Sequence, residues 1–298
     1  MKRQLVPLFV IVLVFPLLCP AAHARQPSPE DLQKIRAAVP QKPTVKPSKV
    51  HKVLVLSYQS HDAGRFAGEA ALRIMAEQTG IFTLDFVRDK NDLAEAMMPE
   101  NLKNYDAVCL NNSTGGQGNA NNGKTLTENL NEYVLNGGNL FGFHSATDNR
   151  MGAVFGGFFS GHPWSGKVAV KLDEPDHPLN NAFGGTGFWT SDEIYQFNRG
   201  IYSREKLRVL LSLDMEAVKK KGARQDDDNA ISWIKNHGQG RVFYCSLGHN
   251  PRAFQDTRIV QHMLDGIQFA LGDLKADAAP SATLDPKPTP ALAPPDES

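Results

Sequence analysis

Three histidines and one glutamate occupy positions of this sequence where side chains often carry chemistry. His144 and His249 come just after apolar runs, and His162 lies in a glycine-rich stretch. Glu193 precedes an aromatic run. Imidazole and carboxylate groups are ligands for zinc and other divalent ions, and they also transfer protons near neutral pH. The four residues therefore predict metal-assisted or general acid/base chemistry.

The spacing of these residues leaves both chemistries open. No His-x-x-x-His pair occurs, so a metal site would have to be assembled by the fold from distant segments. We place Asp148 beside them as a carboxylate that orients the cluster. The predicted catalytic residues are thus His144, Glu193, His249 and Asp148, and the predicted ligands of a divalent metal such as zinc are His144, His162, Glu193 and His249. We expect four other histidines of the domain to be structural: His51, His177, His237 and His262.

Polar residues beside these positions are candidates for substrate binding. Side-chain amides and hydroxyls hydrogen-bond to polar ligands, and a tryptophan can stack on the flat face of a ligand. The same residue types serve turns and packing, which is the competing interpretation. A Ser145 nucleophile with His249 as its base is disfavoured, because no Gly-x-Ser-x-Gly elbow is present. The substrate-binding candidates are Ser57, His61, Asn111, Asn112, Ser145 and Trp164.

Alternating strands and helices must position these side chains. Apolar runs typical of buried parallel strands alternate with helical segments over the first half of the domain. This order predicts an α/β fold with a doubly wound, mostly parallel sheet, in which ligands bind beyond the carboxyl ends of the strands. The expected strands cover 53–56, 81–87, 106–110 and 140–143, and the expected helices cover 66–78, 92–98 and 126–135.

The second half of the domain is less regular. Its apolar runs are short and separated by polar loops, and we expect several of them to pair antiparallel. A single domain, residues 51–273, holds all of these elements. The expected strands are 168–172, 194–197, 209–213, 230–234 and 242–245, followed by a closing helix at 259–271.

The two ends of the chain differ in composition from this domain. Residues 1–24 show a basic start, an apolar stretch and a small-x-small ending, which predicts a signal peptide and export to the periplasm or the medium. Residues 25–50 form a Pro- and Lys-rich leader. Residues 274–298 are rich in Ala and Pro and are expected to be a disordered tail. No membrane contact is expected once the signal peptide is removed.

Charge and cysteine content argue against several functions. The 298 residues carry 32 basic and 32 acidic side chains, so no net attraction to nucleic acid or anionic membranes is expected. In the predicted mature chain, Cys109 and Cys245 each lie in an apolar run typical of a buried strand. We expect both to pack in the core. A disulfide between them would need a proximity that the sequence does not give.

Four segments resemble the signature blocks of the ThuA-like (trehalose-utilisation) family. They occur in the same order as in that family and together span nearly all of the domain. The resemblance implies the flavodoxin-like fold of the class I glutamine amidotransferases in a single domain. The four segments are 137–148, 155–163, 192–195 and 240–249.

One position departs from the enzymes of that fold. A glutamine amidotransferase has a nucleophilic cysteine at a sharp turn after a central strand, whereas this chain has His144 and Ser145 there, so thiolate chemistry is disfavoured. The resemblance implies a carbohydrate substrate, and a hydrolase, lyase or isomerase acting on a sugar or keto-sugar would need the acid/base groups above. The alternative is a sugar-binding module that keeps the fold without the chemistry.

Overall fold

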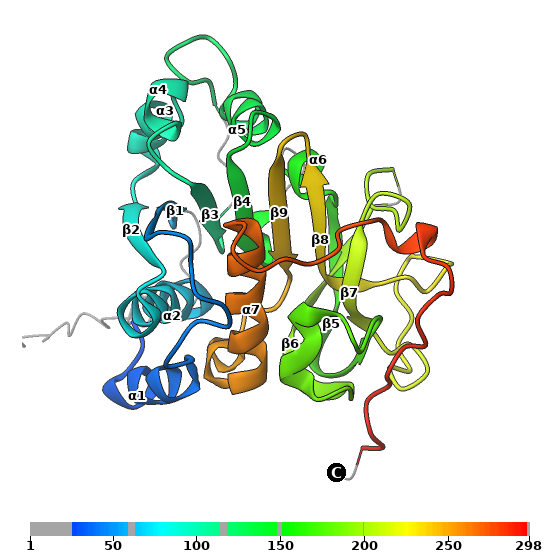
Figure 1. The fold of residues 1–298 in the computed structure, drawn as a ribbon. Coiled ribbons are helices and arrows are strands. Elements are labelled where there is room, and N and C mark those ends of the chain that lie inside the picture. The colour runs from blue at the N-terminus through cyan, green and yellow to red at the C-terminus, as the bar shows by residue number, and fades with distance from the viewer. Residues whose placement is uncertain (1–25, 59–62, 114–117, 148–150, 199, 297–298) are drawn as a thin grey trace, which may run out of the picture.

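The computed structural model of the protein describes residues 26–58, 63–113, 118–147, 151–198 and 200–296. These residues form one nine-stranded sheet with the strand order β2-β1-β3-β4-β9-β8-β7-β5-β6 (Figure 1). The strands are β1 His51–Leu56, β2 Phe82–Val87, β3 Ala107–Asn111, β4 Asn139–Phe143, β5 Phe159–Leu172, β6 Phe188–Phe197, β7 Arg208–Leu213, β8 Ala230–His237 and β9 Gly240–Cys245. The helices are α1 Pro29–Ala38, α2 Ala63–Thr79, α3 Leu93–Ala96, α4 Pro99–Leu102, α5 Leu126–Leu135, α6 Gly152–Phe155 and α7 Thr257–Ala270.

The sheet has a parallel half and an antiparallel half. Among strands β2, β1, β3, β4 and β9, each neighbouring pair is parallel. From β9 through β8, β7 and β5 to β6, the pairings in the described residues are antiparallel. The chain thus leaves the parallel half after β4, builds the antiparallel half, and returns as β9 beside β4. The predicted mixed α/β fold with a mostly parallel core is confirmed.

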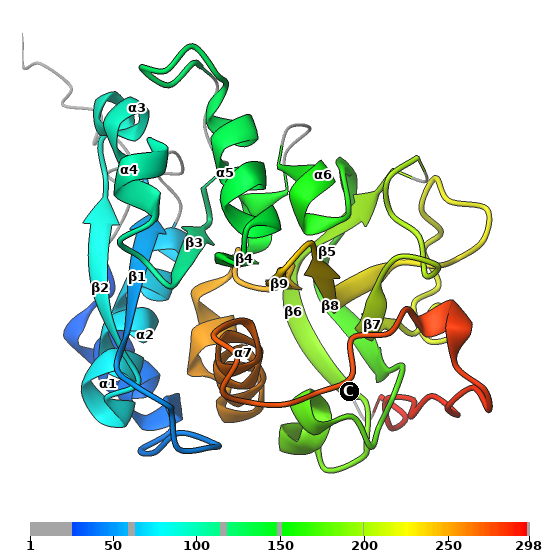
Figure 2. The ribbon, with the colours of Figure 1, turned by 45° about the horizontal axis from the view of Figure 1, so that its top comes forward.

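Helices cover both faces of the parallel half (Figure 2). Alternate side chains of a strand point to opposite faces, so Cys109 of β3 joins one buried cluster whereas Val108 and Leu110 join the other. Helices α1, α2 and α7 contribute to the first cluster, and α3 to α6 contribute to the second. Across the described ranges, none of these helices combines the length and the apolar character that crossing a bilayer requires.

The two cysteines are core residues, as predicted. Cys109 and Cys245 are both buried with free thiols. Burial raises the pKa of the Cys245 thiol to about 12. This thiol is therefore protonated at neutral pH and does not act as a nucleophile.

The leader packs onto the domain. Helix α1 begins with a capping box, in which Ser28 and Asp31 each accept the other's backbone N–H, and it lies against α2. Farther along, the backbone N–H of Thr44 donates to Gln268 of α7 at 2.8 Å. Residues 26–50 thus wrap around the face of the sheet that α2 and α7 cover.

The C-terminal segment, residues 274–296, differs from the disordered tail that its composition predicts. Leu172 at the end of β5 exchanges two backbone hydrogen bonds of 2.9 Å with Ala291. The Trp189 indole donates to the Pro294 carbonyl at 2.8 Å. A prediction from composition considers only how much apolar surface a segment can bury. It does not consider backbone hydrogen bonds to other parts of the chain. This segment is instead held by hydrogen bonds to strands β5 and β6 of an existing sheet.

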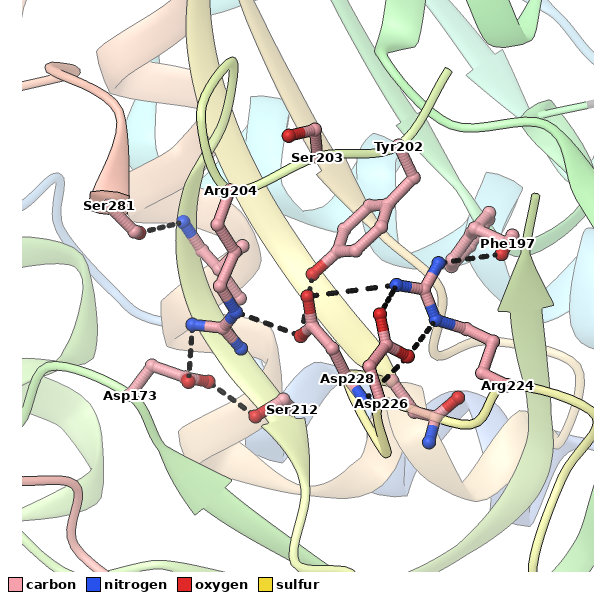
Figure 3. A network of polar contacts seen from close by, with 12 residues as sticks. Asp173, Phe197, Tyr202, Ser203, Arg204, Ser212, Arg224, Asp226, Asp228 and Ser281 are labelled. Atoms are coloured by element: carbon pink, nitrogen blue, oxygen red, sulfur yellow. Dashed lines mark hydrogen bonds and ion pairs between the residues drawn. The ribbon is translucent and has the colours of Figure 1, made fainter. Parts of the chain in front are cut away.

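An ion-pair network stabilises the antiparallel half (Figure 3). Arg204 contacts Asp173 and Asp228 at 2.8 Å each. The Tyr202 hydroxyl donates to Asp228 at 2.9 Å, and Arg224 lies 3.9 Å from the same carboxylate. Asp173 follows β5, Arg204 precedes β7 and Asp228 precedes β8. The network therefore links the loops next to strands β5, β7 and β8.

Truncation of the chain after Asp273 should destabilise the fold. It removes the two hydrogen bonds at Leu172, the one at Trp189 and others such as those that Arg208 donates to Asp277 and Ala279, each worth about 1 kcal/mol net. We expect urea denaturation to show a loss of at least about 3 kcal/mol in the free energy of unfolding. Lys287→Ala is the control, because this exposed side chain should contribute less than about 0.5 kcal/mol. Equal stability of the truncated and full-length chains would rule out a structural role for the segment.

Candidate functional site

Four of the predicted residues come together where the parallel half meets the β5–β6 hairpin. His144 directly follows β4, and His249 lies just beyond the end of β9. His162 belongs to β5 and Glu193 to β6. Although β4 and β6 are far apart in the strand order, the ring centroids of His144 and Tyr195 are 4.3 Å apart. The hairpin therefore returns to the carboxyl end of β4.

Glu193 lies at the centre of this cluster. Its Oε1 atom is 3.5 Å from Nε2 of His144 and 3.9 Å from Nδ1 of His249. Its Oε2 atom is 3.4 Å from Nδ1 of His162. The side chain of His144 is 2% exposed and that of Glu193 20%, whereas His162 and His249 are 54% and 44% exposed. The cluster has a buried floor and a solvent-facing rim.

Contacts around His144 fix the direction and the tautomer of its ring. The residue has a φ of 48°, a left-handed conformation that is uncommon for residues other than glycine. The Tyr244 hydroxyl donates to the His144 carbonyl at 2.5 Å. Nδ1 lies 3.0 Å from the Ser246 carbonyl oxygen, which can only accept, so we assign the ring proton to Nδ1. Nε2 is then the atom that faces Glu193.

A bulge in β5 directs His162 toward Glu193. The register of the β5–β6 pair shifts between Phe159 and Gly161, and again between Gly161 and Trp164. Gly161 has a φ of 145°, which favours glycine, and bulges redirect side chains near functional sites. The Phe159 and His162 rings stack with their centroids 6.1 Å apart. The bulge and the stacked ring together hold His162 at the second carboxylate oxygen.

The geometry of the cluster fits a divalent metal ion. His144, Glu193 and His249 each offer one ligand atom, and these atoms lie within 4.8 Å of one another. Two ligand atoms about 2.1 Å from a tetrahedral ion lie about 3.4 Å apart, close to the 3.5 Å between His144 and Glu193. His162 contacts the other oxygen of Glu193 and stands outside this group of three. Among the residues that the structure describes, these three could together hold an ion.

The imidazoles keep Glu193 ionised. The contact with Nε2 of His144, when that ring is protonated, is the largest cause that lowers the pKa of Glu193, and the charge of His249 adds to it, while burial opposes the shift. The neighbouring Asp192 shows the opposite balance. Burial raises the pKa of Asp192, although backbone N–H groups that bind its carboxylate oppose the shift. Glu193 is therefore an anion at neutral pH and can serve as a ligand or a base.

Three of the predicted substrate-binding residues are buried and bonded within the protein. Ser57 is fully buried and its hydroxyl donates to Glu69 at 2.8 Å. The Asn111 amide donates to the Ser57 hydroxyl at 3.0 Å. The Asn112 amide donates to the Gly248 carbonyl at 3.0 Å. These contacts support the loops at the carboxyl ends of β1, β3 and β9.

The other candidates are placed differently. Trp164 is 2% exposed, and its indole donates to the Lys220 carbonyl at 2.7 Å, so it serves packing. Ser145 lies next to His144 in the short 3-10 helix after β4 and is partly exposed. His61 and Asp148 lie outside the described residues.

Two residues close to Glu193, Asp192 and Tyr195, have no specific role in the sequence-based predictions. Asp192 accepts backbone N–H groups of the loop that carries His249. The Tyr195 ring contacts that of His144, at a centroid distance of 4.3 Å. Their position in one short segment with a candidate ligand is the signal that could have identified them.

Comparison with known proteins identifies the family. Residues 52–270 match the family profile described as ThuA, trehalose utilisation. The chain belongs to the ThuA family. The ThuA-like resemblance inferred from the sequence is thereby confirmed. No curated protein sequence matches this ThuA chain.

Solved structures of ThuA-like proteins share the fold. One from Bacteroides uniformis is 22% identical, with a TM-score of 0.59 over 76% of this chain and 94% of that one. One from Parabacteroides merdae is 17% identical, with a TM-score of 0.58 over 77% of this chain and 93% of that one. At these identities the likeness establishes the fold of this ThuA chain and not its reaction.

The lowered pKa of Glu193 predicts a pH-dependent contribution to stability. A carboxyl whose pKa is lower in the folded than in the unfolded chain stabilises the fold above its ordinary value of 4.5, and that stabilisation is lost as the pH falls through the lowered pKa. Glu193→Gln removes it. Urea denaturation of metal-free protein should therefore show a stability gap between wild type and variant that narrows below pH 4.5.

The control for this measurement is Glu205→Gln, at an exposed position. Its free energy of unfolding should follow that of the wild type at every pH. A gap for Glu193→Gln that widens as the pH falls below 4.5 would mean that the imidazoles do not stabilise the carboxylate.

Proposed function

We propose that this ThuA protein is an exported carbohydrate-processing enzyme that acts on a sugar or keto-sugar through the cluster at Glu193. The observation that carries the proposal is the 3.5 Å approach of Nε2 of His144 to Oε1 of Glu193. Membership of a family described by trehalose utilisation supports a carbohydrate substrate. Imidazoles around an ionised carboxylate are suited to metal-assisted or general acid/base chemistry.

The residues of the cluster divide into two roles in this proposal. His144, Glu193 and His249 hold a divalent ion such as zinc, and an ion bound there would polarise a carbonyl oxygen and stabilise the negative charge that develops on it. His162, on the exposed side of Glu193, moves a proton to or from the substrate. Proton transfer beside a carbonyl is the step shared by elimination and isomerisation of a keto-sugar. Without an ion, the same imidazoles and carboxylate serve as acid and base.

We further propose that the parallel half is a flavodoxin-like, doubly wound sheet. Its order β2-β1-β3-β4-β9 reads 2-1-3-4-5 when the antiparallel strands are counted as an insertion, which is the flavodoxin-like order. Buried clusters on both faces support this assignment. In such sheets ligands bind outside the carboxyl ends of the strands, the edge where His144 and His249 follow β4 and β9.

Export of the protein is tested by its mature N-terminus. The basic start, apolar stretch and small-x-small ending of residues 1–24 support cleavage by signal peptidase. Intact mass spectrometry of protein recovered outside the cytoplasm of a bacterial host should show a chain that begins at Arg25. Recovery only from the cytoplasm, with Met1 retained, would contradict export.

Metal content tests the proposed role of the cluster. Elemental analysis of purified protein, prepared without chelators, should give one divalent ion per wild-type chain and none in His144→Ala or His249→Ala, because each variant removes one of three ligands. Turnover of keto-sugar substrates should fall by about 10²- to 10⁴-fold in both variants.

His237→Ala is the matched control, because His237 lies on β8 and bonds to Asn131 at 2.7 Å. This variant should keep both the metal and the activity. A folded wild type without metal but with turnover would favour metal-free acid/base catalysis. Sugar binding without turnover would instead support the non-catalytic binding module.

A further inference from the structure

We propose that Asp192 is a positioning residue that sets the metal affinity of the cluster by holding His249 in place. The inference rests on the proposed function, because it takes the cluster to bind a divalent ion. Asp192 is 3% exposed and directly precedes Glu193 in β6. Successive side chains of a strand point to opposite sides. The strand can thus present Glu193 to the cluster and Asp192 to the loop after β9.

The Asp192 carboxylate binds the loop backbone on both sides of His249. Oδ2 accepts the N–H of Gly248 at 2.8 Å, and Oδ1 accepts the N–H of Asn250 at 2.8 Å. Oδ1 also accepts the N–H of Glu193 at 2.9 Å. Hydrogen bonds to an ionised group are about twice as strong as neutral ones. One buried carboxylate therefore fixes the backbone of His249 relative to the central ligand.

Two further contacts confine the same loop. The Asn112 amide donates to the Gly248 carbonyl at 3.0 Å, from a residue with a left-handed φ of 47°. Gly64 in the first turn of α2 packs so closely on the loop that a Cβ added at this position would lie 2.2 Å from the Gly248 carbonyl oxygen. The His249 side chain is itself 44% exposed. Its direction thus depends on the loop backbone more than on side-chain packing.

Asp192→Asn should weaken metal binding without removing a ligand. The substitution replaces one acceptor oxygen with an NH₂ group that faces a backbone N–H, so one of the two loop hydrogen bonds is lost. Residues that orient metal ligands typically change affinity by about 10- to 100-fold when mutated. We expect a drop of that size in Zn²⁺ affinity, measured on the full chain by competition with a chromogenic chelator.

The Co²⁺ absorption spectrum gives a readout that general destabilisation would not change. Its intensity reports the number and geometry of the ligands, so the spectrum of Asp192→Asn should be weaker than that of the wild type and closer to that of unbound Co²⁺. Asp214→Asn is the matched control. Asp214 is also buried and accepts the backbone N–H groups of Glu216 and Ala217, in the antiparallel half. This control should keep the Zn²⁺ affinity and the Co²⁺ spectrum of the wild type, whatever its effect on thermal stability.

The outcomes separate this inference from the proposed function. Unchanged Zn²⁺ affinity in folded Asp192→Asn, with binding impaired in His249→Ala, would overturn the positioning role and leave the metal site intact. Failure of the wild type to bind Zn²⁺ would overturn the metal site and the inference together. If Asp192→Asn does not fold, Asn250→Pro decides by the same criteria, because proline lacks the N–H and the φ of −83° at Asn250 is close to its range.

Discussion

The site depends on two acceptor atoms that cannot face each other without a positive charge between them. Nε2 of His144 and Oε1 of Glu193 lie 3.5 Å apart. A neutral His144 ring has one N–H, and the Ser246 carbonyl accepts it at Nδ1. Two lone pairs at this distance repel each other, more strongly where burial excludes water. A proton or a metal ion between them removes the repulsion, and each alternative corresponds to one of the two chemistries considered for this cluster.

The two atoms come from opposite halves of the sheet. His144 follows a central parallel strand, and Glu193 belongs to the last strand of the antiparallel half. Their approach therefore requires the whole excursion between β4 and β9 to fold correctly. The Arg204 network and the C-terminal segment stabilise that excursion away from the cluster. Contacts that touch no ligand thus contribute to the geometry of the site.

The sequence predicts local elements well and long-range contacts poorly. Helix α5 is predicted at its observed bounds, because Thr125 and Glu128 form a capping box at its start. Strand β5 begins at Phe159, nine residues before its predicted start. The residues around Gly161 are of types that favour turns, so the sequence predicts a loop there. Pairing with β6 makes this segment a strand instead. His144 and His249 can be identified as candidates from the sequence because they follow predicted strands. The role of Asp192 cannot be identified in this way, because the loop that it binds lies 56 residues farther along the sequence.

The partner of an imidazole, more than its burial, distinguishes His144 from the structural histidines. His262 is fully buried, and burial lowers its pKa to about 4, but its two partners, the Leu179 carbonyl and the Ser232 hydroxyl, are uncharged. No ionised group among the described residues faces this ring. His51 donates its Nε2 proton to Asp273, and the second carboxylate near this ring, that of Asp106 at 3.7 Å from Nδ1, is already bound by the Lys49 ammonium and the Lys52 N–H. A neutral ring suffices there too. In His144 the single ring proton is already donated to the Ser246 carbonyl. The contact with the Glu193 carboxylate therefore requires a second proton or a metal ion, and these are the two species on which acid/base or metal-assisted chemistry depends.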